Sequence, residues 1–181
     1  YMIPHLNDKD EMYKLLCSAI KGVYASVFFA ESKAYMTATR NLIDQEKMAI
    51  IIQEVVGKQY DTSYYPSFSG VGRSLNYYPI NDEQPEDGVA EIAVGLGKYI
   101  VDGGLALRFS PRHPDNVLQT STLDLALRDT QTQFYALDMT DVDTNFSVDD
   151  GFNIQKLRIQ DAAKNGSLKY MVSTYDHLDQ I

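Results

Sequence analysis

Apolar residues recur every three or four positions between residues 8 and 28, and this spacing predicts an amphipathic helix. The repeating positions are Met12, Leu15, Leu16, Ala19, Ile20, Val23 and Val27. Asn7 or Asp8 can cap the start of this helix with a side-chain oxygen. A second helix is predicted from about residue 30 to residue 42.

The pattern changes at residues 48–56, an apolar run rich in β-branched side chains and closed by Gly57. Such a run predicts a strand buried on both faces, as at the centre of a sheet. Gln53 and Glu54 interrupt it, and buried polar groups need partners or cost about 1–3 kcal/mol each. Two explanations stay open: these residues lie at a sheet edge or against water, or they line a pocket for a polar aromatic ligand.

The rest of the chain alternates between further strands, short helical stretches and polar loops. Strands are predicted at residues 69–78, 89–94, 133–139 and 168–175, a helix at 157–164, and loops at 60–67, 81–88 and 138–151. Helices mixed with β-branched strands favour an α/β or α+β fold over an all-helical one. A boundary near residues 110–116 divides the chain into parts 1–114 and 115–181, although two subdomains on one sheet fit equally well.

Composition narrows the class of protein. With 25 acidic against 16 basic residues the formal net charge is −9, which argues against binding to a nucleic-acid backbone but leaves ATP open. The single cysteine, Cys17, cannot form an internal disulfide, which fits a reducing compartment, and no signal peptide or apolar run of about 18 residues is present. We therefore expect a cytoplasmic protein that binds no membrane. Because the chain lacks an initiator methionine, we also expect it to be cut from a longer one.

Two glycine-rich segments fall short of the known phosphate-binding motifs. Residues 95–98 read Gly-Leu-Gly-Lys, but Ile92 and Tyr99 stand where a P-loop needs glycine and serine or threonine. Residues 70–72 read Gly-Val-Gly, but Leu75 replaces the third glycine of a dinucleotide fingerprint. Taken alone, these glycines indicate turns or close packing. The three histidines have no metal-ligand spacing, so we expect no metal site within the chain; that it holds no catalytic residue is an implication of the family resemblance described next.

Taken in order, several segments resemble the nucleotide-binding domain of the phosphoenolpyruvate synthase and pyruvate phosphate dikinase family. They are Ala25-Ser26-Val27-Phe28, residues 49–56, Phe68-Ser69-Gly70-Val71, Val94-Gly95-Leu96-Gly97 with Ile100-Val101-Asp102-Gly103, and Arg108-Phe109-Ser110-Pro111. The resemblance covers residues 1–114 well and the remainder poorly. It implies an ATP-grasp-like subdomain with a mixed or antiparallel sheet flanked by helices.

The resemblance also implies an ATP site. It places Gln53, Glu54 and Val55 at the adenine, where the Gln53 carbonyl would accept from the exocyclic amine and the Val55 N–H would donate to a ring nitrogen. It makes Gly70, Gly95 and Gly97 pocket or loop positions. Lys98 departs from the family, which commonly has glutamate at that position. The family's catalytic lysine and arginine, its metal-binding carboxylate and its phosphohistidine domain match no segment of this chain.

The family reaction defines our expectation for the parent protein. It is a phosphotransferase that moves phosphate from ATP through a phosphohistidine to pyruvate, with water or phosphate as second acceptor, Mg²⁺ as cofactor and the remaining domains of the chain as partners. This piece alone is expected to be inactive, since phosphoryl transfer depends on cations it lacks. The alternatives are a dikinase domain with another acceptor, such as a glucan or an antibiotic, and a non-catalytic interaction module that has lost ATP.

Overall fold

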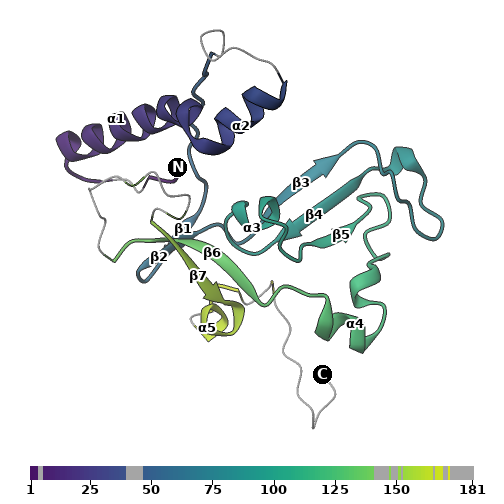
Figure 1. Ribbon diagram of the computed structural model, residues 1–181. Helices are drawn as coiled ribbons and strands as arrows, with labels where there is room; N and C mark the ends of the chain where they lie inside the picture. The colour runs from purple at the N-terminus through teal and green to yellow at the C-terminus, as the bar shows by residue number, and fades with distance from the viewer. Residues whose placement is uncertain are drawn as a thin grey trace. The chain divides into compact units, whose positions relative to one another are not determined.

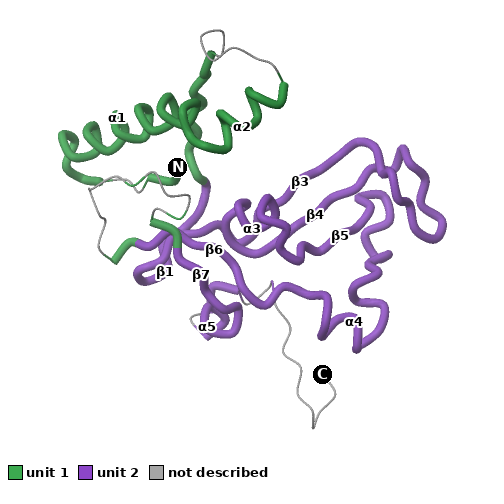
Figure 2. Tube along the Cα trace, viewed as in Figure 1, with its two compact units in different colours: residues 1–55, 139–154 green, residues 56–138, 155–181 purple. Residues whose placement is uncertain are grey.

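The computed structural model describes residues 1–3, 6–39, 47–140, 147, 151, 153–164, 166–168 and 171 (Figure 1). By internal contacts the chain forms two compact units, residues 1–55 with 139–154 and residues 56–138 with 155–181 (Figure 2). The first unit carries the two N-terminal helices. The second carries the paired strands of both sheets, apart from the first residue of the last strand.

The first unit confirms both predicted helices. Helix α1 (Lys9–Ala25) runs through a 3-10 turn (Ser26–Phe28) and is followed by α2 (Ala30–Thr39); residues 40–46 lie outside the described part of the chain. Asp8 caps α1, because its carboxylate accepts the backbone N–H groups of Asp10 at 2.8 Å and Glu11 at 3.1 Å. The buried residues of these elements are Leu15, Ala19, Gly22, Val27 and Met36.

No single helix in the described part of the chain is long and apolar enough to cross a membrane. Residues Lys9–Phe28 and Ala30–Thr39, which meet at a bend of 43°, pass the test of length and composition only when taken together.

The predicted strand at residues 48–56 is wrong. These residues have no regular secondary structure, and Ile51, Ile52 and Val56 are 89%, 68% and 81% exposed. A strand is stabilised by hydrogen bonds and side-chain packing with a neighbour, and no described strand pairs with this segment. High β-propensity has therefore not produced a strand here.

The first sheet has the strand order β1-β2-β6-β7, formed by β1 (Lys58–Tyr60), β2 (Ser63–Tyr65), β6 (Gln133–Asp138) and β7 (Ile154–Arg158). The predicted loop at residues 60–67 is in fact largely a β-hairpin, since β1 and β2 are antiparallel around Asp61, which has φ 55°. Strand β6 confirms the prediction for residues 133–139. Helix α5 (Ile159–Lys164) begins two residues later than predicted, because β7 extends to Arg158.

The hydrophobic core of the second unit includes residues of the first sheet. It consists of Tyr65, Val94, Phe134, Ala136, Ala162 and Leu168, none of which is more than 6% exposed. The rings of Tyr65 and Phe134 meet edge to face with centroids 4.9 Å apart. Most of the strand predicted at residues 168–175, and most of the acidic loop at 138–151, lie outside the described residues.

The second sheet is antiparallel, with β3 (Ser69–Arg73), β4 (Val89–Ala93) and β5 (Leu107–Phe109) in that order. Short helices follow β4 and β5: α3 (Lys98–Val101), a 3-10 turn (Leu118–Thr120) and α4 (Leu123–Arg128). Strand β3 ends before the predicted residue 78, because the chain turns at Asn76, whose N–H donates to the Pro85 carbonyl. Helices with two antiparallel sheets confirm the α+β fold class.

Candidate functional site

The predicted adenine contacts lie on the irregular segment that precedes β1. Gln53 and Glu54 are exposed, and neither makes a hydrogen bond within the described part of the chain. Val55 is half-buried and already has an interaction partner. The main chain at Gln53 and Glu54 is therefore not used in sheet pairing, and its donors and acceptors can face a ligand.

Gly95 forms a turn that fits closely against strand β6. Its φ is +82°, and a Cβ atom there would lie 2.5 Å from Phe134 Cδ2 and 2.7 Å from the Tyr135 carbonyl oxygen. The next residue, Leu96, donates its N–H to that carbonyl at 2.9 Å. Only glycine combines this backbone angle with this contact, so packing explains Gly95.

Gln131 fixes the other side of the same turn. Its side-chain amide accepts from Val94 N at 2.7 Å and donates to the Val94 carbonyl at 3.0 Å. Gln131 thus replaces the missing strand neighbour of Val94 and ties the end of β4 to the start of β6. Nothing in the residue order around position 131 pointed to this role.

The structure brings the predicted glycine positions together. Ser69, which precedes Gly70 on β3, donates its hydroxyl to the Gly95 carbonyl at 2.6 Å. A Cβ atom at Gly70 would lie 2.9 Å from the Glu91 carbonyl oxygen, so strand pairing explains this glycine. A Cβ atom at Gly97, by contrast, would meet nothing nearer than Ser69 Cβ at 3.6 Å, which is ordinary contact. Packing gives no reason for glycine at position 97.

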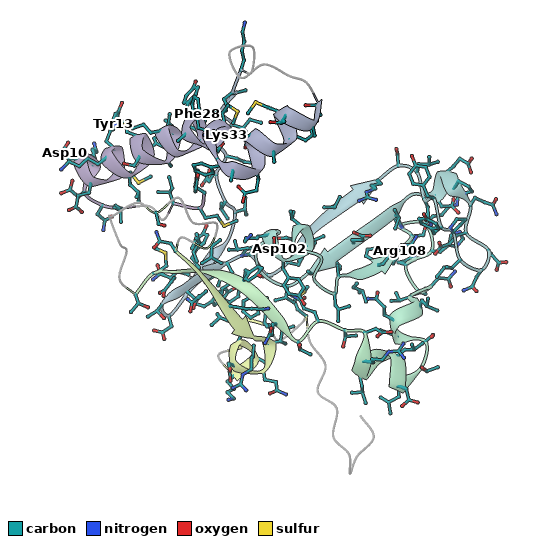
Figure 3. The ribbon with its side chains drawn as sticks, in the orientation of Figure 1. Asp10, Tyr13, Phe28, Lys33, Asp102 and Arg108 are labelled. Carbon is teal, nitrogen blue, oxygen red and sulfur yellow. The ribbon has the colours of Figure 1, made fainter. Side chains whose placement is uncertain are left out.

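A charged cluster follows directly on this turn. Lys98, at the start of α3, pairs with Asp102 (labelled in Figure 3) at 3.1 Å. Its ammonium group lies 6.0 Å from the centroid of the Tyr135 ring. Lys156 on β7 lies 5.8 Å from the same centroid. Burial, and then the neighbouring Asp102 carboxylate, raise the pKa of the Tyr135 hydroxyl above its usual value. The charge that Lys98 brings to this position is therefore balanced within the protein.

The sequence singled out Lys98 but missed its neighbours. Asp102 lies one turn after Lys98 on α3, but Tyr135 on β6 and Lys156 on β7 are distant in the chain, and their closeness to Lys98 is visible only in the structure. Among the residues that the structure describes, no group of three or more His, Cys, Asp or Glu side chains could hold a metal ion. The described residues thus include an exposed stretch of main chain at Gln53 and Glu54 but no cluster of side chains suited to a metal ion.

The part of the chain that the structure describes thus forms an α+β fold in which the main chain at Gln53 and Glu54 is exposed and outside sheet pairing, and a glycine turn fits closely against strand β6. The family model of the pyruvate phosphate dikinase AMP/ATP-binding domain matches residues 5–168, and the chain belongs to this family. The predicted resemblance is thereby confirmed. Searches of curated proteins and of solved structures gave no match.

Proposed function

We propose that this chain forms the adenine-recognising part of an ATP-dependent dikinase. In the complete protein, phosphate passes from ATP through a phosphohistidine to pyruvate. The single observation behind the site is the exposed, unpaired main chain at Gln53 and Glu54 in a member of an AMP/ATP-binding family.

The chemistry of adenine suits such a segment. Its edge presents the exocyclic amine as a donor and a ring nitrogen as an acceptor, so one carbonyl and one N–H can recognise it. The Gln53 carbonyl would accept from the amine, and the family resemblance assigns the ring nitrogen to the Val55 N–H. Guanine presents the opposite pattern at this edge, so the carbonyl and the N–H that pair with adenine would face a like group instead of a partner.

Nucleotide analogues test this assignment without altering the protein. Purine riboside triphosphate lacks only the exocyclic amine, so the complete protein should bind it about 2–10-fold more weakly than ATP, the loss of one hydrogen bond. GTP should bind more weakly still. Calorimetry with the three nucleotides measures both differences, and equal affinity for all three would remove the adenine site from this segment.

Two variants distinguish the contribution of the main chain to ATP affinity from that of the side chain. Gln53→Ala keeps the backbone carbonyl and should leave ATP affinity nearly unchanged, whereas Val55→Pro removes the N–H and should weaken it. Circular dichroism must show that the proline variant is folded, since Val55 has a partner in the chain. If Val55→Pro binds ATP as the wild type does, the non-catalytic interaction module becomes the better account.

The chain alone should not transfer phosphate. Phosphoryl transfer depends on positioning and on cations that neutralise the phosphates, and the described residues hold no metal cluster. Titration of the 181-residue chain with Mg-ATP should give weak binding or none, and no turnover. Pyruvate-dependent ATP consumption by this chain would refute the proposed inactivity.

The acceptor rests on the family resemblance alone. A dikinase with the same nucleotide domain can act on a glucan or an antibiotic, because the acceptor binds elsewhere. Assaying ATP consumption by the complete protein with pyruvate, a glucan and an antibiotic decides among them, and pyruvate is the one we expect.

A further inference from the structure

The second unit contains a cavity of about 370 Å³ that none of the predicted site residues lines. It lies on one face of the β3-β4-β5 sheet, at the paired residues Glu91 on β4 and Arg108 on β5. Ile80, Ile100, Leu105 and Leu118 form much of its wall. Its volume is within the range of small-molecule sites, which combine apolar walls with a few polar groups.

Arg108 is held in place by neutral groups. Arg108 is labelled in Figure 3. Its Nη2 donates to Asn76 Oδ1 at 2.6 Å and to the Tyr78 carbonyl at 2.9 Å. Asn76 is fully buried and is fixed in turn, because its Nδ2 donates to Glu83 Oε2 at 3.0 Å. These contacts orient the guanidinium group without neutralising it, since an amide and a carbonyl oxygen carry no net charge.

The remaining donors of Arg108 are free. In the described part of the chain, Nε and Nη1 of Arg108 make no hydrogen bond, and no carboxylate forms an ion pair with this residue. Nη2 already donates both of its hydrogens, but Nη1 can still donate a charge-assisted hydrogen bond to a carboxylate or phosphate. Arg108 therefore lines the cavity with an oriented cation that forms no ion pair within the described part of the chain.

Glu91 supplies the opposite charge. It is directly opposite Arg108 in the antiparallel register, so both side chains stand on the same face of the sheet. The side chain of Glu91 likewise forms no hydrogen bond or ion pair with any residue that the structure describes. One cavity is thus lined by two unpaired charges of opposite sign on adjacent strands.

The part of the cavity wall beside Glu91 and Arg108 is held together by hydrogen bonds of one side chain, Gln119. Gln119 accepts from the backbone N–H of Arg108 at 2.9 Å and donates to the carbonyls of Ala106 at 2.8 Å and Asp129 at 3.1 Å. This single side chain attaches the 3-10 turn at Leu118–Thr120 to strand β5. The cavity is consequently formed by hydrogen-bonded elements, which favours a site that exists before its ligand arrives.

We propose that this cavity binds a small zwitterion with an apolar body, of the α-amino acid type. Its carboxylate pairs with Arg108, its ammonium group with Glu91, and its side chain contacts Ile100, Leu105 and Leu118. Both charges of an α-amino acid are attached to one carbon, which suits two charged residues on neighbouring strands. The site is independent of the adenine segment and needs no nucleotide.

Three matched probes test the proposal by calorimetry on the 181-residue chain: L-leucine, 4-methylpentanoate and 3-methylbutylamine. The second lacks only the ammonium group of leucine and the third only its carboxylate. Leucine should bind about tenfold or more tightly than either, because each lost partner removes a charge-assisted hydrogen bond. The proposal is overturned if the three bind equally, or if leucine, methionine and phenylalanine all fail to bind at about 10 mM.

Two variants assign the contacts. Glu91→Gln keeps the shape of a side chain that has no partner, so it should weaken the binding of leucine about tenfold or more and should not weaken the binding of 4-methylpentanoate. Arg108→Gln should weaken both of these probes and leave 3-methylbutylamine unchanged. Arg73→Gln, an exposed arginine on β3 outside the cavity, is the control and should change nothing. Should Glu91→Gln weaken leucine and 4-methylpentanoate alike, Glu91 would have only a structural role and the zwitterion site would be wrong.

Discussion

Replacing Gly95 by alanine should destabilise the second unit, because the turn before α3 has no room for a methyl group. The φ of +82° at this position is one that L-residues with a side chain rarely adopt. A Cβ atom would also lie 2.5 Å from Phe134 Cδ2, in a ring that is fully buried in the core. Neither neighbour can yield easily, since Tyr135 belongs to the central strand β6 and accepts from Leu96 N at 2.9 Å.

The expected loss has two parts. Alanine in the left-handed region costs about 1–2 kcal/mol relative to glycine. Forcing a methyl group into a packed core costs about 1–3 kcal/mol more, because side chains and backbone must shift. The sum is about 2–5 kcal/mol, a large part of the roughly 5–15 kcal/mol that stabilises a typical domain.

Urea unfolding followed by circular dichroism measures this loss in the isolated chain. Gly95→Ala should lower the midpoint with an unchanged m-value, which shows that stability and not compactness has changed. Gly97→Ala is the matched control: its φ is −59° and its Cβ would lie 3.6 Å from the nearest atom, so it should change stability by less than about 1 kcal/mol. If the two variants unfold at the same urea concentration, the account of this turn is refuted.

Three further predictions concern hydrogen bonds and charge. Asn76→Ala should destabilise the protein by about 2–4 kcal/mol in urea unfolding, since it removes one of the two donors to the carboxylate of Glu83, only 4% exposed, and leaves it the Ile80 N–H alone, and it also removes the acceptor of Arg108. Asp8→Ala should cost about 1 kcal/mol by the loss of the cap of α1, whereas Asp10→Ala, which keeps that cap, should cost less. Because the pKa of Tyr135 is raised, its contribution to stability is complete below the ordinary tyrosine pKa of about 10 and is lost as pH rises through the folded-state value. The difference between the alkaline absorbance titrations of wild type and Tyr135→Phe should therefore show a tyrosine that ionises late; a curve at the usual pKa would contradict this.

Sequence patterns predicted the elements whose stability is local or strongly periodic. Helix α1 was predictable because its apolar stripe and its cap, Asp8, are both visible in the residue order. Strands β4 and β6 were predictable because each is a short apolar run bounded by polar or glycine residues. In these cases residues that are neighbours in the sequence are enough to predict the element.

The errors arose where structure depends on a partner. Residues 48–56 have the composition of a central strand. A strand also requires a neighbouring strand to pair with, and the sequence alone does not show whether one is present. Conversely, the hairpin of β1 and β2 lies in a polar stretch of tyrosine and serine, and β2 is stabilised by pairing with β6, which lies far along the chain. Strand β7 was missed for the same reason.

The site was predictable only in part, and the two glycines of the Gly-Leu-Gly turn show why. The motif alone could not distinguish a glycine needed for packing from one needed for a ligand. In the structure, contact with Phe134 fully explains Gly95, whereas at Gly97 a methyl group meets nothing closer than ordinary contact. If this turn serves nucleotide binding, the requirement for close approach falls on Gly97. A Gly97→Ala protein that unfolds like the wild type but binds ATP more weakly would locate the nucleotide at this turn, and one that binds ATP equally well would leave the turn a purely structural element.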